Sequence, residues 1–238
     1  MSSTLLRERR TRESGNRAEM AVQHVELQPP GIPEGCLSTR SRWYIRTKRV
    51  GDIVLASIAL ILTLPLWGFI ALAIKLGSPG PVFFRQKRPG RNMKVFEILK
   101  FRTMVQDAED RLAEVVDVND TRDPLIRLEH DPRVTGVGHL LRVTSLDELP
   151  QLINVLKGEM SMVGPRPISR PIYDSRNRIR LQVTPGITGL WQVSGRKNGD
   201  TNFMLTKDME YLDKRSLWFD CGILVKTVLA VIRADGAR

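Results

Sequence analysis

The sequence contains few of the residues on which several protein classes depend. Only two cysteines, Cys36 and Cys221, occur among its 238 residues, too few for a disulfide framework or a thiolate zinc site. Aromatic residues make up 6% of the chain, which weakens any interpretation based on the stacking of nucleic-acid bases. We therefore expect a protein of a reducing, cytoplasmic setting.

Several motifs of phosphate and ester chemistry are also absent. The sequence has no Gly-Lys-Ser phosphate loop, no Gly-x-Gly-x-x-Gly after a strand and no Gly-x-Ser-x-Gly elbow. Its three histidines, His24, His130 and His139, lack the spacing typical of metal ligands. These absences argue against nucleotide hydrolases, dinucleotide-dependent enzymes, esterases and histidine metal sites.

Positive charge is in clear excess. The chain holds 37 Lys and Arg against 26 Asp and Glu, a formal net charge of +11, and 42% of its residues are hydrophobic. This mixture excludes a wholly disordered chain and a polytopic membrane protein. The charge indicates an anionic partner, and composition alone does not choose among nucleic acid, anionic lipid and a phosphorylated substrate.

The sequence pattern divides the chain into three parts. Residues 1–46 carry scattered charges, three prolines and no sustained periodicity, which predicts a disordered basic tail. Residues 47–76 centre on an apolar run, and residues 77–238 alternate short apolar runs with turns. The last part is therefore predicted to form a small mixed α/β (α+β) domain.

The apolar run, residues 53–74, contains 22 residues without a charge. A helix of this length spans roughly 33 Å at ~1.5 Å per residue, which is comparable to the apolar thickness of a bilayer. The pattern favours a membrane helix, and the alternative is a helix buried in a protein core.

The flanks of this run indicate how it meets the membrane. Basic residues lie on both sides: Arg40, Arg42, Arg46, Lys48 and Arg49 before it, and Lys75, Arg85, Lys87, Arg88, Arg91 and Lys94 after it. Cationic flanks prefer the cytoplasmic side, and Pro65 within the run removes a backbone donor and kinks a helix. We therefore predict a re-entrant helical hairpin that enters and leaves on one face, rather than a spanning helix with a Pro kink.

Apolar periodicity and turn residues predict the other elements. The predicted strands are 81–84 and 94–99, joined by a turn at 90–92. The predicted helices are 105–118, 146–156 and 217–232, and 164–200 is predicted to be mainly loop with short strands. The last helix is amphipathic, so it lies either in the core or in the membrane interface.

Two adjacent acids, Asp147 and Glu148, form the main candidate for chemistry. One interpretation is structural, because Ser145 and Glu148 have the spacing of a capping box at a helix start. The other is functional, because a carboxylate in a first helical turn stays ionised near the positive end of the helix dipole. Such a pair can attack phosphorus and hold a divalent cation, and the residues alone leave both interpretations open.

Cations suited to phosphate oxygens accompany the acids. The candidates are Lys100, Arg102, Arg133, Arg142 and Arg166. Arg grips phosphate through a planar fork of donors, and Arg166 stands between Pro165 and Pro167 on a stiff backbone. Each cation alone is typical of a solvated surface, but together with the paired acids and a membrane element they indicate a site for a diphosphate substrate.

A series of motifs then extends from Lys48 to about Arg233. The motifs lie at residues 48–49 with 52, 77–84, 100–104, 131–135, 145–151, 158–161, 164–167 and 185–196. With these motifs in this order, the chain resembles the small form of the bacterial sugar transferase family. These are monotopic polyprenyl-phosphate phosphoglycosyl transferases that start exopolysaccharide and related glycans.

The resemblance implies roles for individual residues. Asp147 resembles the nucleophile that forms a covalent sugar-phosphate intermediate, and Glu148 resembles its partner and a ligand of Mg²⁺. Arg142 and Arg166 resemble phosphate clamps. The remaining implied roles are the shaping of the nucleotide site by Pro165 and Pro167, and the break in the re-entrant membrane helix at Pro65.

The resemblance also implies the reaction and the partners. A hexose-1-phosphate, expected to be galactose- or glucose-derived, passes from a UDP-sugar to undecaprenyl phosphate, which yields the undecaprenyl-diphosphate sugar and UMP. Residues 77–238 would be the catalytic domain, held by membrane lipid on the cytoplasmic face of the bacterial inner membrane, with no nucleic acid as partner. The oligomeric state, a homo-oligomer included, stays open. The alternative functions are a non-catalytic membrane scaffold of polysaccharide assembly and a basic nucleic-acid-binding protein.

Overall fold

The computed structural model describes residues 40–108, 110–111, 131–168, 175–195 and 201–232. All of them lie within one compact unit, Gly35–Arg238. Most of the predicted tail, 1–46, falls outside the described residues, and its last residues belong to a helix that begins before the predicted boundary at 47.

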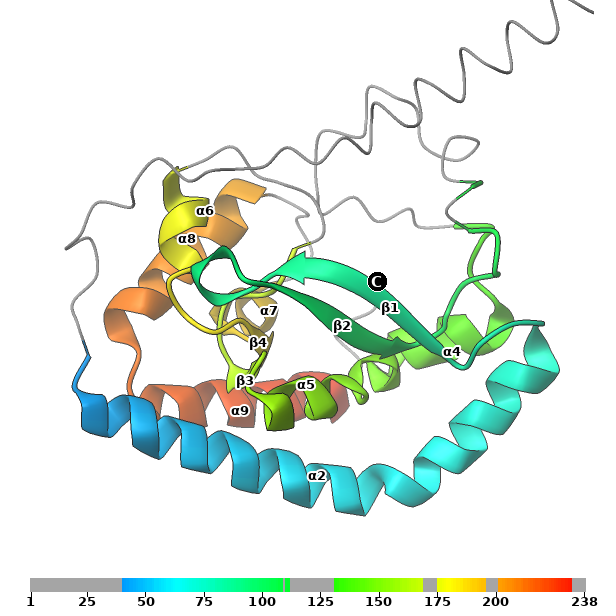
Figure 1. The fold of residues 1–238 in the computed structure, drawn as a ribbon, viewed down its shortest axis with the longest axis horizontal. Coiled ribbons are helices and arrows are strands. Elements are labelled where there is room, and N and C mark those ends of the chain that lie inside the picture. The colour runs from blue at the N-terminus through cyan, green and yellow to red at the C-terminus, as the bar shows by residue number, and fades with distance from the viewer. Residues whose placement is uncertain (1–39, 109, 112–130, 169–174, 196–200, 233–238) are drawn as a thin grey trace, which may run out of the picture. The chain divides into compact units, whose positions relative to one another are not determined.

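The described elements mix helices with two small sheets (Figure 1). In chain order they are α2 (Arg42–Gly77), β1 (Phe83–Pro89), a 3₁₀ turn (Arg91–Met93), β2 (Val95–Phe101), α4 (Gly136–Val143), a second 3₁₀ turn (Leu146–Glu148), α5 (Gln151–Lys157), β3 (Ser161–Val163), α6 (Ser175–Arg180), β4 (Gly186–Thr188), α7 (Leu190–Ser194), α8 (Thr201–Lys214) and α9 (Leu217–Ile232). The prediction of a mixed α/β fold with one long apolar helix is confirmed.

Helix α2 carries the whole apolar run. Ser41 caps its start, where the side-chain oxygen accepts from the Tyr44 backbone N–H at 3.2 Å. Pro65 lies inside the helix, and Figure 1 shows that α2 is bent rather than straight. Because proline lacks the N–H and its ring clashes with the preceding turn, it accounts for the bend.

Both halves of α2 pack against the same unit. In the first half, Arg49 donates to the carbonyls of Val155 and Leu156 at the end of α5, at 2.6 and 2.8 Å. Asp52 accepts from the Met162 backbone N–H of β3 at 3.0 Å. In the second half, Ile70 and Ile74 pack with Phe101 and Leu141. Residues before and after the bend therefore touch one body.

Much of α2 is nevertheless exposed and apolar. Only 17% of its most hydrophobic 18-residue stretch is buried. Ile61, Leu62 and Phe69 expose 71%, 75% and 72% of their surface. A core helix would be mostly buried, so that alternative is wrong, and the exposed face is typical of a segment that meets lipid.

Strands β1 and β2 form an antiparallel hairpin around the predicted turn, but each strand begins and ends later in the chain than predicted. Phe84 pairs with Lys100, and Arg88 pairs with Phe96. Since alternate residues share a face, Arg88 and Lys100 lie on one side of the hairpin, and Arg85 and Lys87 lie on the other.

Strands β3 and β4 form a parallel pair that ends where Gly164 begins the next loop. Gly164 donates its N–H to the Thr188 carbonyl, and Gly186 donates its N–H to the Pro165 carbonyl, both at 2.9 Å. A Cβ on Gly186 would lie 2.1 Å from the Gly164 nitrogen, so only glycine permits this approach. The pairing fixes the start of the loop 164–168.

The helix predictions have mixed outcomes. The predicted helix 217–232 is confirmed as α9. The predicted helix 146–156 is divided into a 3₁₀ turn and α5, because proline at 150 interrupts the first turn. Residues 106–108 form a turn where a helix was predicted, and most of 105–118 lies outside the described residues.

Candidate active site

Asp147 and Glu148 lie in the 3₁₀ turn between α4 and α5. Ser145 precedes them with a φ of 58°, a left-handed conformation that costs an ordinary residue about 1 kcal/mol. The Ser145 side chain makes no capping hydrogen bond to the turn, so the capping-box interpretation is wrong. Asp147 is buried, with 9% of its surface exposed.

Two cations from distant parts of the chain meet this acid pair. Lys100 of β2 places Nζ 3.0 Å from Glu148 Oε1 and 3.7 Å from Asp147 Oδ2. Arg166 of the loop after β3 donates from Nη2 to the same Glu148 oxygen at 3.0 Å. Glu148 thus joins the hairpin to the loop, and both cations face the nucleophile candidate.

Arg142 approaches from the end of α4. Its Nε donates to Thr103 Oγ1 at 3.0 Å, which fixes the direction of the side chain. Its charge is felt at Asp147, where it acts to lower the pKa of that carboxyl. The structure therefore brings Lys100, Arg142 and Arg166 together around Asp147.

Burial dominates the charge state of Asp147. Loss of hydration raises the pKa of Asp147 above its usual value, Lys100 acts in the opposite direction, and the neighbouring Glu148 raises the pKa further. A carboxylate kept in this way is poorly solvated and flanked by cations. Such a group is available to attack an electrophile, and its ionised form is stabilised when a ligand brings further positive charge.

The loop that carries Arg166 is held by its carbonyl groups. Arg180 donates from Nη2 to the Arg166 carbonyl, while its Nε pairs with Asp208 at 2.7 Å in a buried ion pair. Arg88 donates from Nη1 to the Pro167 carbonyl at 2.7 Å. Pro165 and Pro167 are buried, so they contribute backbone geometry to the site.

Two predicted phosphate ligands, Arg102 and Arg133, contact other parts of the chain. Arg102 donates to the carbonyls of Ser78 and Pro79, each at 2.8 Å, and so holds the chain that leaves α2. Arg133 makes a two-point pair with Asp131, at 2.8 and 2.7 Å, and donates to a backbone carbonyl as well. Residue type suggested these arginines as phosphate ligands, but in the fold their donors contact these other groups.

Three contributors were missed from the sequence: Arg88, Arg180 and Asp208. Arg88 was counted only as a basic flank of the apolar run, although strand alternation places it on the Lys100 side of the hairpin. No local pattern pairs Arg180 with Asp208, because 28 residues separate them.

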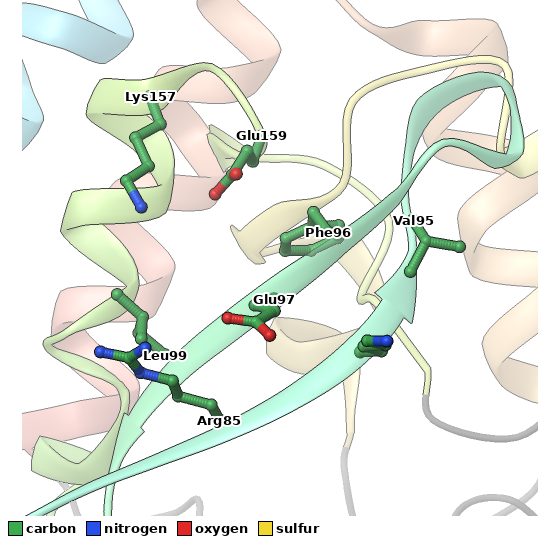
Figure 2. Close-up of a pocket in the computed structure, with 8 residues that line it drawn as sticks. Arg85, Val95, Phe96, Glu97, Leu99, Lys157 and Glu159 are labelled. Carbon is green, nitrogen blue, oxygen red and sulfur yellow. The ribbon is translucent and has the colours of Figure 1, made fainter.

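A separate cavity of about 340 Å³ opens beside the hairpin. Figure 2 shows Arg85 and Glu97 of the hairpin facing Lys157 and Glu159 at the end of α5. Neither Asp147 nor Glu148 lines it. The cavity is therefore distinct from the candidate active site.

The acid pair fits a magnesium ion by the chemistry of its donors. The described residues contain no cluster of three or more His, Cys, Asp or Glu arranged to hold a metal. Magnesium, however, commonly binds through one or two carboxylates together with substrate phosphates rather than in an all-protein cage. Asp147 and Glu148 supply that number of hard oxygen ligands.

The model of the bacterial sugar transferase family matches residues 43–234. The chain belongs to the bacterial sugar transferase family. The resemblance drawn from the motifs is confirmed, and the match covers α2, the hairpin, the acid pair and α9 alike.

Curated relatives include transferases of exopolysaccharide assembly. The exopolysaccharide production protein ExoY of Rhizobium meliloti is 41% identical over 197 residues, 80% of this chain and 87% of that protein. The undecaprenyl-phosphate galactose phosphotransferase of Salmonella typhimurium is 41% identical over 215 residues, 84% of this chain and 43% of that protein. The UDP-glucose:undecaprenyl-phosphate glucose-1-phosphate transferase of Caulobacter vibrioides is 42% identical over 229 residues, 91% of this chain and 79% of that protein. The chain thus spans less than half of the Salmonella protein but most of the other two.

Proposed function

We propose that this chain transfers a hexose-1-phosphate from a UDP-sugar to undecaprenyl phosphate, which yields the undecaprenyl-diphosphate sugar and UMP. The observation that carries the proposal is the buried Asp147 beside Glu148, within reach of Lys100 and Arg166. The printed names of the Salmonella and Caulobacter relatives support the donor and acceptor classes.

The reaction divides into two displacements at one phosphorus atom. An Asp147 oxygen forms a bond to the β-phosphorus of the donor, the bond from this phosphorus to the bridging oxygen breaks, and UMP leaves with the electron pair. A phosphate oxygen of undecaprenyl phosphate then attacks the same phosphorus, and the Asp147 carboxylate is released. The soluble nucleotide can therefore leave before the lipid acceptor reacts.

The cations make attack by one anion on another feasible. Lys100 and Arg166 lie at the acid pair, where they reduce the repulsion between Asp147 and the donor phosphates. Glu148 would hold Mg²⁺, which when bound would supply further charge neutralisation to the phosphate oxygens. Arg102 and Arg133 have no part in this proposal, because their donors hold other segments.

The decisive test is release of UMP. The purified chain is mixed with undecaprenyl phosphate, magnesium and either UDP-galactose, UDP-glucose or a UDP-N-acetylhexosamine. We expect UMP release with galactose or glucose donors, dependence on the acceptor for turnover, and loss of activity when the magnesium is chelated. A non-catalytic scaffold or a nucleic-acid-binding protein would release no UMP with any donor, and that result would overturn the proposal.

The bent α2 supports a re-entrant, monotopic arrangement on the cytoplasmic face of the inner membrane. Arg49 and Asp52 bind the catalytic domain before the exposed apolar stretch, and Ile70 and Ile74 pack against it afterwards. A spanning helix would place these two groups on opposite sides of the bilayer. Exposed Trp218 on α9, which exposes 87% of its surface, suits the same lipid interface.

Cysteine labelling tests this arrangement. In a chain with Cys36 and Cys221 replaced by Ser, Arg42→Cys and Lys75→Cys are each treated with a membrane-impermeant maleimide. Both positions are exposed at the ends of α2. We expect neither to react from the periplasmic side of intact spheroplasts, and both to react after lysis, as does a control cysteine at Lys87. Labelling of one position in intact spheroplasts would establish a spanning helix instead.

A further inference from the structure

Arg88 is a fourth cation of the site, besides Lys100, Arg142 and Arg166. It lies on β1, on the same face of the hairpin as Lys100, and it is not among the residues that line the cavity of Figure 2. Burial and the nearby Arg166 lower the pKa of Arg88 to about 10, and Glu148 acts in the opposite direction. Arg88 therefore lies close enough to Arg166 and Glu148 to feel both charges.

The contacts of Arg88 use only part of its guanidinium. Nη1 donates to the Pro167 carbonyl at 2.7 Å, and Nε and Nη2 donate to Gln86 Oε1 at 3.1 and 2.7 Å. Among the described residues, no carboxylate forms an ion pair with it. A guanidinium has five N–H groups, so one remains on each terminal nitrogen, a number suited to a phosphate.

Among the residues that the structure describes, positive charge exceeds negative charge around the acid pair. Lys100, Arg166, Arg142 and Arg88 bring four positive charges to the two negative charges of Asp147 and Glu148. Arg88 and Arg166 both lie near Glu148, which pairs with Arg166, and a further anion beside both arginines would reduce the repulsion between them. An excess of positive charge at this place favours a polyanionic ligand such as a diphosphate ester.

We propose that Arg88, together with Arg166, binds the diphosphate of the nucleotide-sugar donor directly. This inference rests on the proposed function and adds a ligand to it. The two guanidinium groups approach from different elements, the hairpin and the loop after β3, and Pro167 links them because Arg88 donates to its carbonyl. Binding of the donor would thus connect the hairpin and the loop through contacts with the same diphosphate.

The strand itself supplies matched controls. Arg85 and Lys87 have the same charge and lie on the same strand, but they line the cavity on the other face. We compare Arg88→Gln and Arg88→Lys with Arg85→Gln and Lys87→Gln. The measurements are KM for the UDP-sugar, inhibition by UDP and by uridine, and the rise in melting temperature that UDP causes.

Arg88→Gln is expected to weaken UDP binding and raise the donor KM by about 10- to 100-fold, the range for a lost hydrogen bond to a charged group. Uridine, which lacks phosphate, should bind Arg88→Gln and wild type alike. Arg88→Lys should recover part of the UDP affinity, because the charge stays while the fork is lost. The two control variants should stay within about twofold of wild type.

A purely structural role for Arg88 predicts a different pattern. Loss of the Pro167 contact alone would lower the melting temperature without ligand and weaken uridine and UDP equally, which would overturn the inference. Unchanged UDP affinity in Arg88→Gln would also overturn it. If Arg88→Gln does not fold, Arg88→Lys decides, because wild-type UDP affinity there excludes a bidentate contact. Absence of UMP release by wild type would count against the proposed function, independently of any Arg88 variant.

Discussion

Asp147→Asn is expected to abolish sugar-phosphate transfer and, at the same time, to raise the melting temperature of the protein. An amide oxygen does not attack phosphorus, so turnover should fall by about 10⁴-fold or more, as for removal of other catalytic nucleophiles. Wild type incubated with donor alone should carry the sugar phosphate on the peptide that contains Asp147, and the variant should carry none. Mass spectrometry of the digested protein detects the adduct.

The gain in stability follows from the raised pKa of Asp147. Between the unfolded and the folded pKa, the folded protein binds more protons than the unfolded chain, so stability falls as the pH rises through this window. At neutral pH without magnesium the ionised Asp147 therefore destabilises the fold. A neutral amide of the same shape removes this cost, and a gain of roughly 1 kcal/mol is typical when an active-site residue is replaced.

Thermal unfolding at several pH values shows whether Asp147→Asn raises or lowers the stability of the protein. The advantage of Asp147→Asn should be largest near neutral pH, should shrink as the pH falls from the raised pKa of Asp147 toward the usual pKa of Asp, and should be absent below the latter. Asp213→Asn, at an exposed position on the surface, serves as the control and should leave the melting temperature unchanged. Full turnover by Asp147→Asn would show that another group is the nucleophile, and a lower melting temperature would show that Lys100 and Arg166 outweigh the burial of the carboxylate.

Local patterns predicted those parts of the molecule that depend on neighbours in sequence. The amphipathic periodicity of 217–232 sets one face of α9, and the turn near Gly90 sets the β1–β2 hairpin. The acid pair was recognisable because Asp147 and Glu148 are adjacent. The bend of α2 was predictable from Pro65, because the effect of a proline on a helix is local.

Long-range partners could not be predicted in this way. Arg102 and Arg133 share the residue type of Arg166, and only the fold decides that their donors hold backbone and Asp131 while Arg166 meets Glu148. The left-handed Ser145 was missed for a related reason, because serine gives no sequence signal for a positive φ. Charge and residue type therefore identify candidates, and tertiary contacts select among them.

Asp208→Asn is expected to cause the largest loss of stability among single substitutions near the site. Asp208 and Arg180 each expose 1% of their side-chain surface and pair at 2.7 Å. Burial raises the pKa of Asp208 too, but its loss leaves Arg180 buried without a counter-ion, which costs about 3–5 kcal/mol. This is a large part of the total stability of a typical protein, roughly 5–15 kcal/mol. The cations beside Asp147 are less buried, with 18% of the Lys100 and Arg166 side chains exposed, so the sign differs there. Thermal unfolding in detergent measures the loss.

A surface pair on the same helix provides the control. Glu210 of α8, two residues after Asp208, pairs with Lys214 at 2.9 Å, but both side chains are partly or largely exposed. Glu210→Gln should change stability by less than about 1 kcal/mol, because exposed pairs are weak. A melting temperature of Asp208→Asn equal to that of Glu210→Gln would refute the role of burial.

The double substitution Arg180→Met with Asp208→Leu separates stability from catalysis. Apolar side chains of similar volume often replace a buried ion pair without loss, so the double variant should recover most of the melting temperature. Arg180 also donates to the Arg166 carbonyl, however, and no apolar residue replaces that contact. Misplacement of a positioned group by about 1 Å can cost ~10² in rate, so UMP release should stay well below wild type although the fold is restored. Recovery of both stability and full activity would mean that Arg180 stabilises the fold but does not position Arg166.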